Sequence, residues 1–490
     1  MNVETQKNRA AQGQITVQAK STGQRPDVEG PPPNDAGQLS RLPERTWRYL
    51  CATVMLAAAV LRFYRLALVP LHHDEGVNGY FLTSLFRNGF YHYDPANYHG
   101  PSLYYLALLT TKINSLLFGK AGLSTVAIRF VPAIIGLATV WLVLELREYL
   151  GDYGALGAAV LIAISPGSVY FSRYFIHEIP FTFFTLGIVV ALLRYYKTSD
   201  PPYLMLASAS AALLFATKET AIISVIVLVL AYMCAATYQT LRATRIPEPS
   251  KVVRAKPRRR SSSAETIVPA RPQTDWVARF GGRQRLLLLS LGALAIFLGI
   301  HILLYSSFFT NLRGVYDSVA TFKYWTATGV RDDIHDVFTY LRWLGQEELP
   351  LLLLGTAGFT LALFKPRNRF ALFAGFWAAG MLAAYSLIPY KTPWLALNII
   401  VPLAIISGCG IEMMVAKVKI IRRERVRVFL ASAAGISLIM YAYQAIDLSF
   451  SAYDDDSQPY VYAHTRRQLF PMLEKIDEIA AHSGDRKSVV

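Results

Sequence analysis

The sequence has few cysteines and few acidic residues for its length. Its 490 residues include three cysteines, Cys51, Cys234 and Cys409, which lie far apart in apolar stretches. A disulfide scaffold is therefore excluded, and small core residues are expected rather than a redox pair or a zinc site. Charged residues make up only 17% of the chain, with 33 Asp and Glu against 49 Lys and Arg. This composition excludes an ordinary soluble globular protein, a collagen and a disordered chain.

The amino-terminal residues lack the pattern of a cleavable signal peptide. Residues 1–48 are polar, contain Pro31-Pro32-Pro33, and delay the first apolar run too long. We therefore expect this segment to be a disordered tail on the cytoplasmic side.

The sequence is rich in long hydrophobic stretches. Hydrophobic residues make up 53% of the chain, the mean hydropathy is +0.32, and the apolar residues gather in blocks. Each block has roughly the 20 residues that a helix needs to cross the hydrocarbon of a bilayer. The sequence predicts an all-α, polytopic membrane protein with about eleven transmembrane helices. The predicted spans are 49–71, 125–147, 154–174, 179–196, 203–217, 219–237, 286–308, 349–364, 370–388, 395–415 and 428–446.

The segment 102–118 decides the topology. It is apolar but short, so it either crosses the membrane or lies at its surface. If it lies at the surface, the basic loops all fall on the cytoplasmic side, as the positive-inside rule requires. The largest is 238–285, with twelve Lys and Arg against three acids. A nucleic-acid patch is the alternative for this loop. The flanking spans favour contact with anionic lipid head groups, so we predict no nucleic-acid partner.

The resulting topology divides the chain into five parts. These are the tail 1–48, a catalytic transmembrane module 49–237 with an outer loop 72–124, the basic loop 238–285, a second group of spans 286–446, and an appendage 447–490. In the appendage, an amphipathic helix is expected from Leu469 to Ala481. The loops expected on the outer face are 72–101, 173–178, 217–219, 309–348 and 389–394.

The outer loops contain the residues that suggest chemistry. The first begins with His72-His73-Asp74-Glu75-Gly76 and ends with Tyr98-His99-Gly100-Pro101. Two adjacent acids at a membrane boundary are costly unless they have partners or a task. For His92 and Asp94 of the same loop, a solvated loop with aromatic anchors is the simpler explanation.

The later outer loops add two acids and three cations. Ser172-Arg173 precedes His177-Glu178, and Lys218 and Lys391 lie in the segments Thr217-Lys218-Glu219 and Tyr390-Lys391-Thr392-Pro393-Trp394. Arg173 and Glu178 are also consistent with an ion pair that closes a helix end, and either lysine with a side chain that snorkels to the interface. Together they favour a site with one base that accepts a phosphate as leaving group.

These motifs resemble the membrane glycosyltransferases of the GT-C superfamily. The pattern is D-E in the first outer loop, Y-D-P and H-G-P beyond it, S-R-x-x-x-x-E, T-K-E and a late K-T-P-W. Within the superfamily, the sequence is most similar to the dolichyl-phosphate-mannose-protein mannosyltransferase-like group, including members labelled flippase activity-associated proteins. The resemblance covers about residues 45–400.

The resemblance implies a function and roles for individual residues. The donor would be a sugar on a polyprenyl phosphate, transferred with inversion to an acceptor on the extracytoplasmic face of the cell membrane. Asp74, with Glu75 beside it, matches the family's catalytic carboxylate, and Glu178 matches a second acid. His99 and Lys218 match positions that contact the lipid phosphate, although relatives have lysine where this chain has His99. Trp394 belongs to the K-T-P-W motif.

Elementary chemistry agrees with these roles. A leaving phosphate needs cations rather than a strong acid, and Lys218, Lys391 and Arg173 are the candidates. An acceptor hydroxyl needs a carboxylate that takes its proton, and Asp74 is the candidate.

Two alternatives remain open at this point. A divalent metal is possible, with Asp74, Glu178 and His73 as ligands, although no spacing enforces such a site. The alternative function is a transporter or flippase for lipid-linked sugars, or a protein associated with one. A transporter is expected to place its ionisable residues near the bilayer midplane.

Overall fold

The computed structural model describes residues 39–96, 99–119, 123–245, 281–328, 334–364, 368–418 and 420–483. In these ranges the chain is helical, and extended backbone pairs only in an isolated bridge between Ile334 and Tyr390. The all-α fold class predicted from the sequence is confirmed. The helices are α1 (Glu44–Phe63), α2 (His73–Asn88), α3 (Ser102–Phe118), α4 (Thr125–Leu144), α5 (Arg147–Leu150), α6 (Asp152–Ala163), α7 (Pro166–Phe171), α8 (Glu178–Thr198), α9 (Pro201–Phe215), α10 (Ala221–Arg245), α12 (Arg283–Tyr305), α13 (Arg313–Thr328), α14 (Thr339–Glu347), α15 (Leu349–Phe364), α16 (Arg369–Leu387), η1 (Pro393–Ala396), α17 (Leu397–Val418), α18 (Glu424–Phe450) and α19 (Leu469–Ser483).

The helices that can span a bilayer are fewer than the eleven expected. In the described ranges, eight helices are long and apolar enough, or nine if α14 and α15, which meet at 111°, count as one broken span. Each predicted span except 154–174 corresponds to one helix, and α6 and α9 are short apolar helices of 12 and 15 residues. The chain is a multi-pass membrane protein.

One predicted span is wrong in its continuity. The segment 154–174 forms two helices, α6 and α7, instead of one. Pro166 is the first residue of α7, and the hydroxyl of Ser165 accepts a hydrogen bond from Ser168 N at 3.1 Å. A serine cap followed by a proline begins a new helix, because proline fixes its own φ and has no N–H to donate to the preceding turn.

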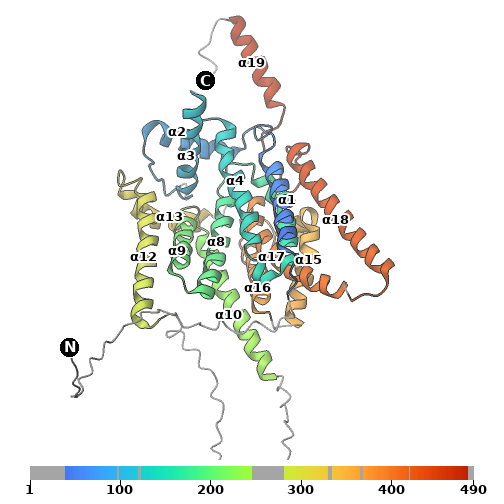
Figure 1. Cartoon of the computed structure of the whole chain (residues 1–490). Helices are drawn as coiled ribbons and strands as arrows, with labels where there is room; N and C mark the ends of the chain where they lie inside the picture. Colours follow the sequence, from blue (N-terminus) through green and yellow to red (C-terminus); the bar gives the residue numbers. More distant parts are fainter. Residues whose placement is uncertain are drawn as a thin grey trace, which may run out of the picture. The chain divides into compact units, whose positions relative to one another are not determined.

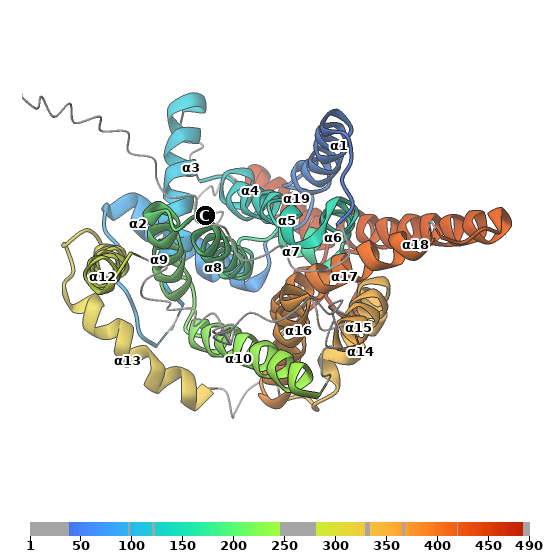
Figure 2. The ribbon, with the colours of Figure 1, turned by 60° about the horizontal axis from the view of Figure 1, so that its bottom comes forward.

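The centre of the bundle is α17, which packs against α6, α15 and α16. Figure 2 shows α15, α16 and α17 side by side. Gly408 of α17 lies against Gly154 of α6, where a Cβ on Gly408 would be 2.5 Å from the Gly154 carbonyl oxygen. The small residues let the two backbones approach closely. Cys409 is buried there, whereas Cys234 is exposed on α10, so the expectation of a core position is wrong for Cys234.

Two helices lie at the margins of this bundle. Figures 1 and 2 both show α18 extending away from the other helices, and its packing is mainly against α7. The segment 102–118 forms α3, which packs against α2 and α4 and is not among the helices that qualify as spans. Its surface position in the membrane stays a prediction.

The proposed division into five parts also stays a prediction. The amphipathic helix expected at Leu469 is present as α19. Of the tail and the basic loop, residues 1–38 and 246–280 lie outside the described residues, so the lipid contact of loop 238–285 is not tested. The edges of both segments are helical, since α1 begins at Glu44, α10 continues to Arg245, and α12 begins at Arg283.

Candidate functional site

Three of the five loops predicted to lie on the outer face meet at one end of the bundle. Gly100 N donates to Thr217 O at 3.0 Å, and Ser102 N donates to Ala216 O at 2.9 Å. Phe175 N donates to the carboxylate of Glu75 at 2.8 Å. Hydrogen bonds therefore join loops 72–101, 173–178 and 217–219, although the first and the last of these loops are more than 100 residues apart in the sequence.

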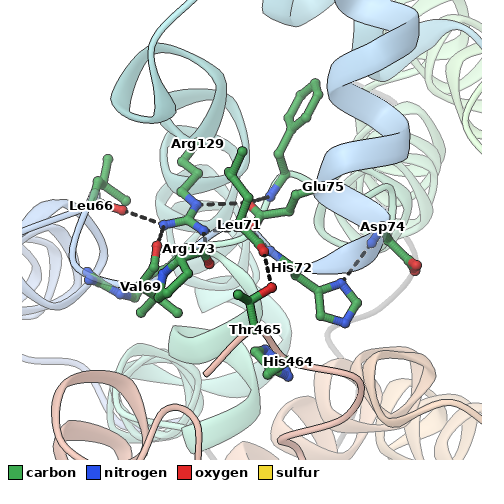
Figure 3. Close-up of polar contacts among 12 residues, drawn as sticks. Leu66, Val69, Leu71, His72, Asp74, Glu75, Arg129, Arg173, His464 and Thr465 are labelled. Atoms are coloured by element: carbon green, nitrogen blue, oxygen red, sulfur yellow. Dashed lines mark hydrogen bonds and ion pairs between the residues drawn. The ribbon is translucent and has the colours of Figure 1, made fainter. Parts of the chain in front are cut away.

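The first turn of α2 holds the acidic pair Asp74-Glu75. His72 caps this helix: its Nδ1 accepts from Asp74 N at 3.0 Å, while His72 N donates to Glu75 Oε2 at 3.0 Å. This reciprocal arrangement satisfies two N–H groups that a helix start leaves open, and the carboxylates lie at the positive end of the helix dipole. Figure 3 shows the turn with Asp74 and Glu75 pointing in different directions.

Glu75 is fully buried and saturated with hydrogen bonds. Arg129 of α4 donates to it from Nε at 2.7 Å and from Nη2 at 2.6 Å. The remaining donors of Arg129 reach backbone carbonyls of residues 66–70, just before α2 (Figure 3). Sequence analysis listed Glu75 among the catalytic candidates, but the structure places it as the anchor of the loop.

Asp74 has the opposite environment. Its side chain is 39% exposed and contacts the exposed His73, whose Nδ1 lies 3.2 Å from Asp74 Oδ1. His73 also lines an open hollow of about 620 Å³, together with the aromatic residues Tyr80 and Phe81 of α2 and with Asp94. Asp74 is therefore accessible and held by its backbone, as a general base should be.

A second charged group surrounds Lys218, between α9 and α10. Lys218 Nζ donates to Glu178 Oε1 at 2.6 Å, and both side chains are buried. Burial lowers the pKa of Lys218, but the carboxylates of Glu178 and Glu219 outweigh it and raise the pKa above its ordinary value. Lys218 therefore keeps its positive charge in a site largely closed to water.

Two histidines complete this group. His99 Nδ1 lies 3.2 Å from Glu219 Oε2, and the rings of His99 and His177 are 4.9 Å apart. His177 Nε2 donates to Gly100 O at 3.2 Å. Burial, with the charges of His99 and Lys218, holds the pKa of His177 well below its ordinary value, so its ring is neutral. We call Glu178, Lys218, Glu219, His99 and His177 the Lys218 cluster.

Polar contacts connect α2 to the Lys218 cluster. Asn78 of α2 donates to Phe175 O at 2.9 Å and accepts from the hydroxyl of Tyr104 at 3.0 Å. The Tyr104 ring in turn meets the His177 ring edge-on, with centroids 5.4 Å apart. The helix that presents Asp74 is thus fixed against the segment that carries Glu178.

Two cations predicted to hold phosphate instead bind backbone carbonyls. Arg173 donates to Tyr64 O at 2.7 Å and to Arg65 O at 3.0 Å, at the end of α1. Lys391 Nζ donates to Ser386 O at 3.0 Å and to Ile388 O at 2.5 Å, at the end of α16. Both cations cap the negative end of a helix, which is a structural role.

Trp394 contacts the candidate site through His72. It lies in η1, with its ring centroid 5.6 Å from that of His72 and 5.8 Å from that of Tyr462. Two contacts of the first turn of α2 were not predicted from the sequence. The contact of Glu75 with Arg129 had a sequence signal, since Arg129 is a charge inside a predicted span. The contact of His72 with Tyr462 had none.

The predicted metal ligands are not gathered in one place. Within the described part of the chain, no three His, Cys, Asp or Glu side chains are grouped as ligands. His73 contacts Asp74, while Glu178 contacts Lys218. Metal dependence stays a prediction.

Comparison with known proteins identifies the fold. The chain is similar to ArnT from Cupriavidus metallidurans bound to undecaprenyl phosphate, with a TM-score of 0.53 at 16% identity, over 86% of this chain and 68% of that one. It is also similar to the Archaeoglobus fulgidus oligosaccharyltransferase, with a TM-score of 0.53 at 16% identity, over 88% of this chain and 57% of that one. The protein has the GT-C fold.

A family model agrees with this assignment. The model described as dolichyl-phosphate-mannose-protein mannosyltransferase matches residues 98–249, which include His99, Arg173, Glu178 and Lys218. The resemblance to mannosyltransferase-like GT-C proteins inferred from the sequence is thereby confirmed. A search of curated protein sequences gave no match.

Proposed function

We propose that this GT-C protein is a glycosyltransferase that moves a sugar from a polyprenyl-phosphate carrier to an acceptor on the extracytoplasmic face of the cell membrane. The observation that carries the proposal is an accessible carboxylate, Asp74, on a helix that is hydrogen-bonded through Asn78 to the segment just before Glu178, the ion-pair partner of the buried, positively charged Lys218. The family model and the fold shared with an undecaprenyl-phosphate-bound protein support the choice of donor.

The proposed reaction is a single displacement. The acceptor oxygen attacks the anomeric carbon and passes its proton to the carboxylate of Asp74. The bond between that carbon and the phosphate oxygen breaks, and the electron pair leaves with the polyprenyl phosphate. Attack opposite the leaving group inverts the anomeric centre, as in inverting glycosidases.

Lys218 and His99 are the groups proposed to receive the phosphate. Charge builds on the leaving oxygen as the bond breaks, and a fixed cation in a dry site stabilises this charge strongly. An ammonium group has three donors, and the hydrogen bond to Glu178 uses one of those on Lys218. Glu178 is thus a positioning residue for the lysine.

The placement of the Lys218 cluster favours an enzyme over a transporter. Glu178 is the first residue of α8, and Lys218 lies in the connection between α9 and α10. Both are at helix ends, whereas transport sites lie near the midplane on interrupted helices.

The test is a turnover assay with the full-length protein in nanodiscs. Polyprenyl-phosphate sugars would be supplied one at a time, with candidate acceptors, and released polyprenyl phosphate measured. We expect release with one class of donor, loss of release in Asp74→Asn, and normal release in Glu148→Gln at the other end of the bundle. Absence of release with every donor tried would reject the proposed function, and full release by Asp74→Asn would reject Asp74 as its base.

A further inference from the structure

We infer that residues 453–465, which we call the docking segment, form part of the active-site frame and that His464 is a positioning residue for the turn that carries Asp74. The inference rests on the proposed function insofar as Asp74 acts there as the base. No role could be predicted for these residues from the sequence, because they follow the last span and lie outside the region of family resemblance.

The backbone of Tyr462 lies between two imidazole rings. Tyr462 O is 2.8 Å from His72 Nε2, and Tyr462 N donates to His464 Nδ1 at 3.0 Å. Since a carbonyl only accepts hydrogen bonds, Nε2 of His72 carries a proton. Nδ1 of His72 is then the acceptor for Asp74 N. The docking segment therefore fixes the ring form that caps α2 at Asp74.

The other side of His464 is fixed as well. Because its Nδ1 accepts from Tyr462 N, its proton lies on Nε2, which donates to the hydroxyl of Tyr170 at 2.9 Å. Tyr170, on α7, donates in turn to Tyr453 O at 2.9 Å. Burial lowers the pKa of His464 to about 3, so this arrangement persists at neutral pH.

A further contact ties the docking segment to the chain just before α2. Thr465 Oγ1 donates to Leu71 O at 2.7 Å, as Figure 3 shows. Tyr460 and Val461 are buried, and the Tyr462 ring packs against Trp394. The docking segment is therefore packed against the bundle.

The first turn of α2 thus has two supports. Arg129 holds Glu75 from the bundle, and the docking segment holds His72 from the side of α18. The first support fixes the loop as a whole. The second acts on the cap next to Asp74, so its loss should disturb the orientation of the base more than the fold.

The test uses two readouts in the full-length protein. His464→Phe keeps the ring volume but removes both hydrogen bonds. We expect amide exchange in residues 71–76 to rise about tenfold and kcat to fall about tenfold, the usual effect of losing about 1.4 kcal/mol of hydrogen bonding, with KM for the donor unchanged. His464→Asn keeps an acceptor near Nδ1 and should recover part of both.

Two further variants make the outcome specific. His72→Asn keeps a good helix cap but loses the bond to Tyr462 O, so it should also lower kcat, and it carries the test if His464→Phe does not fold. Arg466→Gln removes an exposed ion pair with Asp456 of the docking segment, a pair that does not involve His72 or His464, and should change neither readout. Unchanged exchange at 71–76 in His464→Phe, whatever its kcat, would overturn the inference. If the unaltered protein releases no polyprenyl phosphate, the proposed function fails, while the exchange data still decide whether the segment supports α2.

Discussion

Two buried ion pairs at the same end of the bundle, Glu75–Arg129 and Glu178–Lys218, differ in how completely they are satisfied. Glu75 accepts four hydrogen bonds, two from Arg129 and two from backbone N–H groups. Lys218 donates to Glu178, and the other titratable side chains around it include Glu219, His177 and Tyr390. The Glu75–Arg129 pair therefore holds α2 against α4. The Glu178–Lys218 pair leaves donors of the Lys218 ammonium group for a ligand.

The largest stability effect is expected when the saturated pair is broken. Glu75→Gln leaves the guanidinium of Arg129 buried without a counter-charge, which costs about 3–5 kcal/mol. Unfolding in detergent, followed by denaturant or heat, measures the loss, and Asp74→Asn is the matched control one residue away. A loss below about 1 kcal/mol would show that Glu75 is not the anchor of the loop.

Neutralising the second pair should affect activity instead. In the double variant Glu178→Gln, Lys218→Gln, the two paired charges are removed together and the buried Glu219 keeps its contact with His99, so stability should change less than when one partner of a buried pair is removed alone. Turnover should fall by about 10²–10³, as when a donor to a developing anion is removed. The control is the same exchange in the exposed pair Glu148–Lys197 at the other end of the bundle. Equal turnover in both double variants would contradict the phosphate role of Lys218.

Buried neutral histidines predict a pH dependence of stability. The pKa of His464 is lowered from 6.5 to about 3, so the unfolded chain takes up a proton that the folded chain does not. The stabilisation is complete above about pH 6.5 and is lost as the pH falls toward 3, by at most about 1.4 kcal/mol per pH unit. Melting temperatures between pH 7 and 5 test this. His464→Gln should flatten the slope, and an unchanged slope would contradict the burial of a neutral ring.

The smallest effect is expected at Lys391. Its ammonium group caps α16 through two carbonyls, so Lys391→Gln should cost about 1 kcal/mol of stability and leave donor affinity within twofold. Donor binding by the purified protein measures this. A tenfold loss of affinity would place Lys391 in the phosphate site after all.

Much of this arrangement could be predicted from the sequence. Apolar length gave a helix for every predicted span, and the charge balance of the loops grouped 72–101, 173–178 and 217–219 on one face, where backbone contacts now join them. The break at Pro166 was not predicted because the residues of α6 and α7 form one continuous apolar stretch in the sequence. The length of this stretch indicated one span, in spite of the single proline within it.

The roles of individual cations could not be predicted in the same way. In the sequence, Arg173 and Lys218 both lie near the ends of predicted spans, with an acid within a few residues. The partner that each cation binds depends on which part of the fold lies beside it. Arg173 meets the carbonyls ending α1, and Lys218 meets Glu178. The docking segment was invisible because its contact with His72 uses the backbone of Tyr462, 390 residues further along the chain.

The most direct test of the central claim is Asp74→Asn, with turnover, donor affinity and unfolding measured on one preparation. The amide keeps the shape of the side chain and the backbone bond to His72 but cannot take the acceptor's proton. We expect turnover to fall by about 10²–10⁴, while donor affinity and the unfolding midpoint stay at the values of the unaltered protein. Near-normal turnover with intact donor binding would contradict Asp74 as the base and with it this account of the site.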